Sequence, residues 1–379
     1  MHWHGIESEG HGGAGGGAPH ISEPESPAAL WRRRPPHTLP SRGFGRVLHS
    51  PVCAEPVPGV PDHCCGTGAS GMQEAVQQNC EAMLGKAAAA GVYLRPHVKT
   101  HKCHQIARMQ VGGDKGHGII ASTLPEIRHM AADGFTDITY GVPVTASKIL
   151  PLLAICADYA ATRISILIDS EEQLRDLEAL CADPVAAPSI EAYRSAHSGT
   201  LFGCFLKIDV GYHRAGVDVR RDEAAAVALA RRLHESKPLV FRGIYSHSGN
   251  AYNASSRAEA RAISTLECKH ARKFADSLAA ESIPCPTISV GSTPSCGAAE
   301  KFAGASEIHP GNYVFYDRQQ MAVPVCTEGQ VAVRVLTSVI GHYRLSCWRR
   351  PPAACVLVRV PRSLRLAGGV ASRGLPVQP

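Results

Sequence analysis

The chain has 379 residues, and 44% of them are hydrophobic, which is enough to bury one large core or two ordinary ones. Its apolar runs are all too short to span a membrane, and its net charge of +6 comes largely from arginines near the two ends. These features predict a soluble protein and argue against a membrane or nucleic-acid partner.

The 14 cysteines are scattered without the CxxC pairs of a zinc module, and no signal peptide with a long apolar core precedes them. We therefore expect reduced thiols and a cytoplasmic enzyme. Acidic residues in the first part of the chain count against an organelle transit peptide: Glu7, Glu9, Glu23 and Glu25.

Composition divides the chain into an irregular beginning, a regular middle and an irregular end. Residues 1–70 are rich in Gly, Pro and Arg without an apolar period, which predicts disorder. Residues 72–325 have regular periodicity. An Arg/Pro/Gly-rich tail is expected over 344–379.

The regular part begins with a predicted helix over about 72–90, and from there strands and helices alternate. Thr-x-x-Glu at Thr123 and Ser-x-x-Gln at Ser170 are capping boxes that mark two further helix starts. Additional helices are expected from about 146, over 222–236 and over about 255–281, with a variable loop at 182–199. The expected strands are 92–98, 116–122, 137–140, 163–169, 201–209, 239–247, 287–291 and 307–309.

Eight strands that alternate with helices predict an α/β fold of the (β/α)8 TIM-type barrel class. A Rossmann fold would need a Gly-rich turn after its first strand, and none is present there. In a barrel the carboxyl ends of all strands share one mouth. The polar residues at those ends are Lys99, His213, Arg214, His247, Ser292, Thr293 and His309 to Asn312.

Two of these strand ends predict a phosphate-binding cup. Gly291 lets the backbone come close, and the hydroxyls and amides of Ser292 and Thr293 can donate to an oxyanion. Gly311 and Asn312 offer a second set of donors at the same mouth. A Gly-Ser-Thr-Pro string alone is most often an ordinary turn. Its combination with Gly311 and Asn312 at the same mouth makes the prediction of a phosphate site more specific.

Lys99 lies in the stretch RPHVKTHK, where positive neighbours and partial burial would lower the pKa of its ammonium group and give a usable amine. A lysine at a strand mouth is otherwise simply a solvated charge. An amine that faces a phosphate cup suggests pyridoxal phosphate bound through a lysine.

Three more candidates surround this cofactor. The guanidinium of Arg214 could meet the phenolate oxygen, although a surface ion pair is the simpler reading of that residue. At the carboxyl end of the strand that ends at His247, the aromatic residues Tyr245 and Tyr252 could lie against the pyridine ring or reach the phosphate.

The segments RPHVKTHK, GIIASTLPEIRHMAADGFTDITYGVPV, KIDVGYHRAGV, YSHSGNAY, VGSTPS and EIHPGNYVFYD, in this order, resemble the eukaryotic-type D-serine dehydratases over about 75–343. These enzymes belong to the alanine racemase-like, fold type III pyridoxal phosphate enzymes. The resemblance implies elimination of ammonia from D-serine to give pyruvate, a small D-amino acid as substrate and a possible homodimer.

The resemblance also assigns roles to individual residues. It makes Lys99 the Schiff-base lysine and the base for the Cα proton. It gives Tyr245, Tyr252, Ser292, Thr293, Gly311 and Asn312 to the cofactor, and it places Arg214 and His247 toward the cofactor's oxygen and ring.

The family also uses Zn2+, held by a His-x-Cys pair in a carboxyl-terminal β domain. Here that domain is expected to begin at 326–343 and to be incomplete, because nothing from Arg344 onward resembles it. His-x-Cys spacing occurs at His63/Cys65 and His101/Cys103, but in the wrong part of the chain, so we predict no metal site. HCCGTGASG also stands where the family's opening strand is expected, so both ends are predicted to be altered.

Two alternatives remain open at this point. A D-threonine aldolase-like enzyme shares the fold, the lysine and the metal, and is separated by assaying glycine plus aldehyde against pyruvate. A catalytically lapsed barrel would bind pyridoxal phosphate without turnover.

Overall fold

The computed structural model describes residues 69–196, 199–333, 342–343 and 355–356. Most of the segments expected at 1–70 and 344–379 therefore lie outside the described residues. No helix among the described residues is long and apolar enough to cross a membrane.

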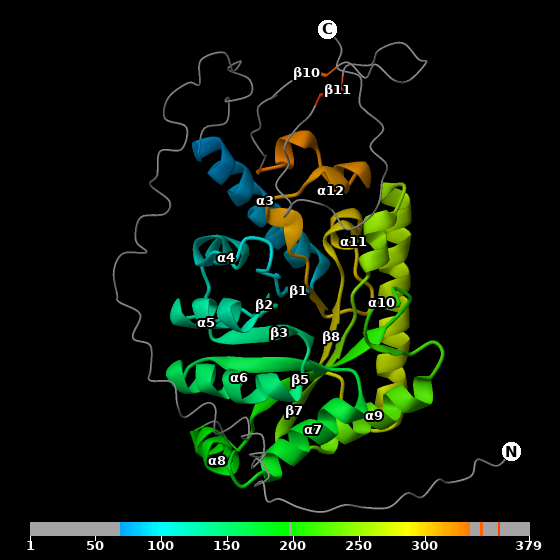
Figure 1. Cartoon of the computed structure of the whole chain (residues 1–379). Coiled ribbons are helices and arrows are strands. Elements are labelled where there is room, and N and C mark those ends of the chain that lie inside the picture. Colours follow the sequence, from blue (N-terminus) through cyan, green and yellow to red (C-terminus); the bar gives the residue numbers. More distant parts are fainter. Residues whose placement is uncertain (1–68, 197–198, 334–341, 344–354, 357–379) are drawn as a thin grey trace, which may run out of the picture. The chain divides into compact units, whose positions relative to one another are not determined.

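The centre of the described structure is a sheet of eight parallel strands, completed by a ninth short one (Figure 1). The strands are β1 (Tyr93–Leu94), β2 (Ile119–Ala121), β3 (Asp137–Pro143), β4 (Arg163–Ile168), β5 (Phe202–Asp209), β7 (Leu239–Tyr245), β8 (Thr287–Val290) and β9 (Glu307–Ile308). Their order is β1-β9-β8-β7-β5-β4-β3-β2, and β6 (Val217–Asp218) pairs additionally with β5.

Backbone hydrogen bonds between the first and second strands close this sheet into a barrel. The amide of Val98 donates to the carbonyl oxygen of Ile120 at 2.8 Å, and the amide of Ile120 donates to that of Pro96 at 2.9 Å. On its other side β1 pairs with β9. The predicted (β/α)8 barrel is confirmed, and every expected strand overlaps one observed strand, although β3 runs to Pro143 and the short β6 was not expected.

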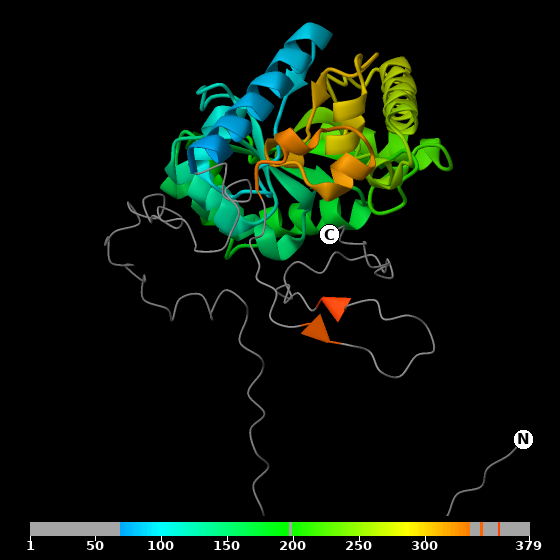
Figure 2. The same cartoon turned by 90° about the horizontal axis from the view of Figure 1, so that it is seen from above.

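Helices lie outside the strands, as the view in Figure 2 shows. The α-helices are α3 (Ala69–Ala90), α4 (His104–Gln110), α5 (Leu124–Ala132), α6 (Ala146–Asp158), α7 (Glu171–Ala182), α8 (Ala187–Ala196), α9 (Glu223–Glu235), α10 (Arg257–Ala280), α11 (Thr293–Ala298) and α12 (Arg318–Ala322). The 3₁₀ helices are η1 (Gly249–Asn253), η2 (Asn312–Val314) and η3 (Glu328–Gln330).

The two capping signals act as expected, with one difference. Ser170 forms a complete capping box with Gln173 at the start of α7. Thr123 accepts a hydrogen bond from the amide of Glu126, but the Glu126 carboxylate accepts from the amide of Ser122, one residue before the cap. The helix start is therefore fixed as predicted, while the reciprocal bond is shifted by one residue.

The expected loop at 182–199 contains the helix α8, so that prediction was wrong. Ile190 and Tyr193 are buried at helical spacing, and α8 contacts α6 and α7. Only one face of this short segment is apolar, and its tertiary packing stabilises a helix that the local pattern does not indicate. A second difference is the two-residue strand β11 (Cys355–Val356), which pairs antiparallel with β10 (His342–Tyr343) although no element was expected after Tyr343.

Alternation along the strands separates two apolar layers. On β5, Cys204 and Leu206 belong to the large cluster beneath the helices, whereas Phe205 belongs to a smaller cluster with side chains from β2, β4 and β7. Lys207 follows Phe205 with the same parity and is therefore on the barrel's interior face. Lys207 lies one interior position nearer the carboxyl end of β5 than Phe205, and its charged side chain therefore reaches the mouth of the barrel.

Close strand packing makes one glycine of β7 irreplaceable. Gly243 has φ +122°, and a Cβ at this position would lie 2.0 Å from the carbonyl oxygen of Thr287. We expect Gly243→Ala to destabilise the protein by about 3 kcal/mol, measured by urea unfolding. The control Gly85→Ala, on the exposed side of α3 with nothing within 4 Å, should be up to about 1 kcal/mol more stable than the parent. Equal effects of the two changes would contradict this account of the packing.

Candidate functional site

A pocket of about 470 Å3, open to solvent, lies at the carboxyl ends of the strands. All nine site residues predicted from the sequence line it: Lys99, Arg214, Tyr245, His247, Tyr252, Ser292, Thr293, Gly311 and Asn312. The other lining residues are His97, Thr100, Gly141, Lys207 and His309. The structure therefore brings the predicted residues together, although their chemical roles stay predictions.

Lys99 stands at the mouth of this pocket, just after β1. Solvent reaches its side chain, yet the surrounding protein still lowers the pKa of the ammonium group, and the charge of Arg214 lowers that pKa further. The nearby carboxylate of Glu126 partly offsets both effects. The expected direction and the expected contribution of burial are confirmed, but the source of the positive charge differs: Arg214, remote in sequence, supplies it, while burial keeps His97 and His101 neutral by lowering their pKa.

Lys207 is a second amine in the same pocket, and it was not predicted. Its side chain is buried, and its Nζ lies 4.9 Å from the ring centroid of Tyr245. Burial lowers the pKa of Lys207 to about 8, and the charge of Arg214 acts in the same direction. A lysine inside the apolar run LFGCFLKID was the available signal, because a charged residue in a buried strand needs a polar cavity.

Besides His97, two further neutral histidines, His247 and His309, line the pocket beside these cations. The Nδ1 of His247 lies 2.9 Å from the carbonyl oxygen of Gly291, so Nδ1 carries the proton and Nε2 is an acceptor. Burial, followed by the charges of Arg214 and Lys99, lowers the pKa of His247 to about 3. The ring of His309 stacks on Tyr245 with centroids 4.1 Å apart.

His309 has one ring nitrogen without a protein partner. Its Nδ1 lies 2.9 Å from the hydroxyl of Ser289, whereas its buried Nε2 has no hydrogen-bond partner among the described residues. The sequence pattern places His309 at the mouth but assigns it no role. A buried nitrogen of this kind is a candidate contact for a bound group.

The residues of the predicted phosphate cup lie together at the pocket, where their polar groups hydrogen-bond to one another. The hydroxyl of Thr293 accepts hydrogen bonds from the amides of Gly311 at 3.3 Å and Asn312 at 2.9 Å. Ser292 caps the short helix α11, which begins at Thr293. A Cβ on Gly311 would lie 2.9 Å from the carbonyl oxygen of His97, so the backbone can pass there only as glycine.

The charge of the lining is one-sided. It includes the cations of Lys99, Lys207 and Arg214 and contains no carboxylate. Like charges held close together in a partly enclosed space favour binding of an anion. An anionic ligand with more than one charged group suits this pocket best.

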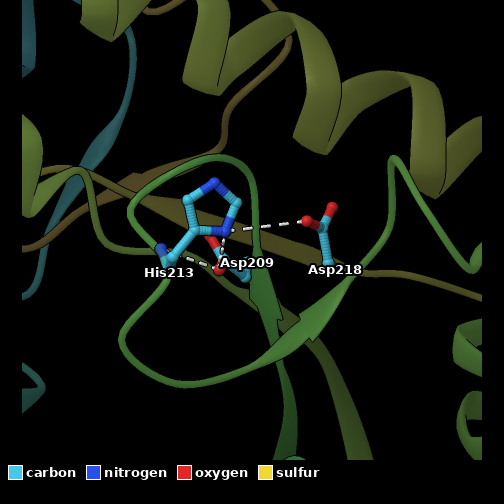
Figure 3. Close-up of side chains that lie close together, drawn as sticks. All are labelled: Asp209, His213 and Asp218. Atoms are coloured by element: carbon cyan, nitrogen blue, oxygen red, sulfur yellow. Dashed lines mark hydrogen bonds and ion pairs between the residues drawn. The ribbon is translucent and has the colours of Figure 1, made fainter.

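Of the two His-x-Cys spacings in the sequence, the one at His101 and Cys103 is committed to other contacts: both ring nitrogens of His101 are used, one by the amide of Cys103 and one by the side chain of Gln110. His63 and Cys65 lie outside the described residues. One other group, formed by Asp209, His213 and Asp218, is compact enough for an ion and is shown in Figure 3.

Comparison with known proteins identifies related sequences over the same region. The family model described as alanine racemase, N-terminal domain, matches residues 72–319. The chain is 31% identical to the D-serine dehydratase of Dictyostelium discoideum over 281 residues, which cover 72% of this chain and 68% of that protein. It is 29% identical to the D-threonine aldolase of Arthrobacter sp., covering 64% of this chain and 58% of the aldolase.

A relative of known structure supports the fold directly. The chain is 33% identical to the D-threo-3-hydroxyaspartate dehydratase of Delftia sp., with 72% of this chain and 67% of that protein covered. The solved structure of this dehydratase superposes with a TM-score of 0.60 at 31% identity, covering 72% and 67% of the two chains.

The neutral histidines of the pocket predict loss of stability in acid. His247 has a pKa of about 3 when folded, below the value of about 6.5 for an unfolded chain, so the unfolded state takes up the proton first as the pH falls. Stability is therefore full above pH 6.5 and falls by up to about 1.4 kcal/mol per pH unit for this residue as the pH drops toward 3.

Urea midpoints measured between pH 7.5 and 5 should show this fall. The slope should be shallower in His247→Gln and unchanged in the control His234→Gln, which alters an exposed side chain of α9. An identical slope in His247→Gln and the parent would show that this histidine is not held neutral.

Proposed function

The chain belongs to the family described as alanine racemase, N-terminal domain, and from this premise we propose that it is a pyridoxal phosphate-dependent ammonia-lyase acting on D-serine. The products would be pyruvate and ammonia. The observation that carries the proposal is one pocket that holds the amine of Lys99 together with Thr293 and the Gly311 and Asn312 amides that hydrogen-bond to its hydroxyl. Similarity to D-serine dehydratases supports the choice of substrate.

The residues present fit pyridoxal phosphate in charge and in shape. The cofactor carries a phosphate and a phenolate, and the lining supplies three cations with no carboxylate. Glycine at position 311 lets the loop that carries the Asn312 amide pack directly against His97, two residues before Lys99. The Nε2 of His309, which has no hydrogen-bond partner among the described residues, offers a contact for a flat heterocycle, and the ring of Tyr245 stacks on His309 and supports it.

Each end of the cofactor has candidate partners. Thr293, Gly311 and Asn312 would hold the phosphate, with Ser292 and Tyr252 beside them. Tyr245, His247 and His309 would lie against the ring. The phenolate is next to the aldehyde on the ring, so its partner must lie near the reactive lysine, and Arg214 is the cation that acts on Lys99.

The pyridoxal phosphate, when bound, supplies a carbonyl carbon for an amine and a π system that accepts electrons from Cα. Lys99 does the acid–base work in our proposal. Its lowered pKa increases the fraction of neutral amine, which takes the Cα proton of D-serine. Departure of the β-hydroxyl and hydrolysis of the resulting enamine then give pyruvate and ammonia.

A retro-aldol activity is the second candidate, because a D-threonine aldolase is among the relatives. It would cleave the Cα–Cβ bond of D-threonine to glycine and acetaldehyde instead of removing the β-hydroxyl. Zinc would assist either reaction at the hydroxyl as a Lewis acid. A barrel that binds the cofactor without turnover is the remaining alternative.

Attachment of the cofactor to Lys99 can be tested chemically. Pyridoxal phosphate should give the visible absorbance of a lysine-linked cofactor, and borohydride reduction followed by peptide mass spectrometry should find the label on Lys99. Lys207 is the internal control, because it lines the same pocket and also has a lowered pKa. Lys99→Ala should lose the absorbance and lower turnover by about 10²–10⁴-fold or more. A label on Lys207 instead would overturn the assignment.

The reaction class can be tested by product analysis. Full-length protein loaded with pyridoxal phosphate should release pyruvate from D-serine and none from L-serine. Glycine and acetaldehyde from D-threonine at a higher rate would favour the aldolase. Lysine-linked absorbance without either product would identify a barrel that binds without turnover.

A further inference from the structure

The loop that carries Arg214 into the pocket is fixed at its start by a buried acid, Asp209, and at its end by a half-buried one, Asp169. At its start the carboxylate of Asp209, the last residue of β5, accepts hydrogen bonds from the amides of Gly211 at 2.7 Å, Tyr212 at 2.9 Å and His213 at 2.8 Å. At its end the amide of Gly216 donates to Asp169 at 2.9 Å. The backbone of this loop is therefore held in one shape.

On the solvent side, an ion-pair network supports the same loop. Figure 3 shows the His213 ring between the carboxylates of Asp209 and Asp218, at 3.2 Å and 3.8 Å from its Nδ1. Arg220 lies 3.3 Å from the Nε2 of His213, and because a guanidinium only donates, Nε2 must be the acceptor. Nδ1 then carries the proton and lies 3.2 Å from the Asp209 carboxylate, so it has no lone pair for a metal. We therefore interpret this group as structural.

The ring of Tyr212, a residue of this loop, lies against Gly249, where a side chain would clash with the ring. A Cβ on Gly249 would lie 2.2 Å from this ring, so the ring packs directly against the backbone of η1. Its edge meets His247, with ring centroids 6.0 Å apart. The guanidinium carbon of Arg214 lies 5.0 Å from the centroid of the same ring.

Arg214 has no ion pair among the described residues, so the Tyr212 ring is its only contact of this strength there. Cation–π contact is directional, because the attraction is greatest over the ring face. We propose that Tyr212 is a positioning residue: seated on Gly249, its ring orients the Arg214 guanidinium toward an anionic group of the ligand at Lys99. This inference rests on the proposed function, because it concerns how the cofactor pocket is prepared.

The position of Arg214 affects the pKa of other titratable groups in the pocket. Its charge lowers the pKa of Lys99, Lys207 and His247. A guanidinium released from the ring would spend more time in solvent, where its charge is screened. The pH at which Lys99 becomes available as a neutral amine should then rise.

The test compares four variants of the full-length protein. Tyr212→Leu removes the ring face, Tyr212→Phe keeps it, and Arg214→Gln removes the charge. The control Tyr93→Leu breaks a similar arginine–tyrosine contact, that of Arg95 at 5.6 Å, which lies outside the pocket lining. The readouts are the affinity for pyridoxal phosphate and the pH midpoint for formation of the lysine-linked absorbance, both without substrate.

We expect Tyr212→Leu to weaken binding of the cofactor by about two- to fivefold and to move the pH midpoint upward, toward that of Arg214→Gln. Tyr212→Phe and Tyr93→Leu should match the parent. If Tyr212→Leu does not fold, Gly249→Ala provides the same test, because its Cβ displaces the ring.

The possible failures are distinguishable. A parent-like midpoint in Tyr212→Leu, with a shifted one in Arg214→Gln, would overturn the positioning role and leave the proposed function intact. An equal shift in Tyr93→Leu would also overturn it, because the effect would then be general. Absence of lysine-linked absorbance in the parent would remove the proposed function and this inference together.

Discussion

Closure of the parallel sheet between its first and second strands is the constraint on which the site depends. The hydrogen bonds of Pro96 and Val98 with Ile120 place β1 between β2 and β9, so Lys99 leaves the barrel beside the loop that contains Gly311. Parallel strands bring all their carboxyl ends to one edge, and closure turns that edge into a ring. Residues from distant parts of the chain therefore converge without any loop reaching across the molecule.

The electrostatics of the pocket follow from this convergence. Arg214, Lys99 and Lys207 share one partly enclosed space, so each cation makes a further positive charge more costly, and the histidines respond by staying neutral. Burial alone would favour neutral groups, but here it acts together with charge repulsion at the same residues. The result is a pocket with two unusually acidic ammonium groups and one permanent cation, since a guanidinium keeps its proton at any physiological pH. Binding of an anion relieves the repulsion among all of them.

The sequence predicted the parts of the site that lie at strand ends, because a change from apolar to polar residues marks the place where a strand leaves the core. It did not predict Lys207, which precedes the end of β5 and faces the interior by alternation alone. It also misjudged which positive charge lowers the pKa of Lys99. Adjacent residues are visible in a sequence, whereas Arg214 is brought near Lys99 only by the fold. The helix α8 was missed because its apolar face is short and depends on α6 and α7. Domain boundaries beyond the barrel stay predictions.

Elimination and retro-aldol cleavage make opposite demands on the substrate hydroxyl, which must gain a proton in the first reaction and lose one in the second. In the proposed reaction a lowered pKa at Lys99 would serve elimination twice, because the neutral amine would be more abundant and the ammonium formed by taking the Cα proton would be a stronger acid toward the departing hydroxyl. The Nε2 of His247 could only accept a proton, because Nδ1 is committed to Gly291, but burial and the charges of Arg214 and Lys99 lower the pKa of His247 to about 3 and make it a weak base for retro-aldol cleavage. The proposed acid–base chemistry at Lys99 therefore favours elimination over retro-aldol cleavage in this pocket.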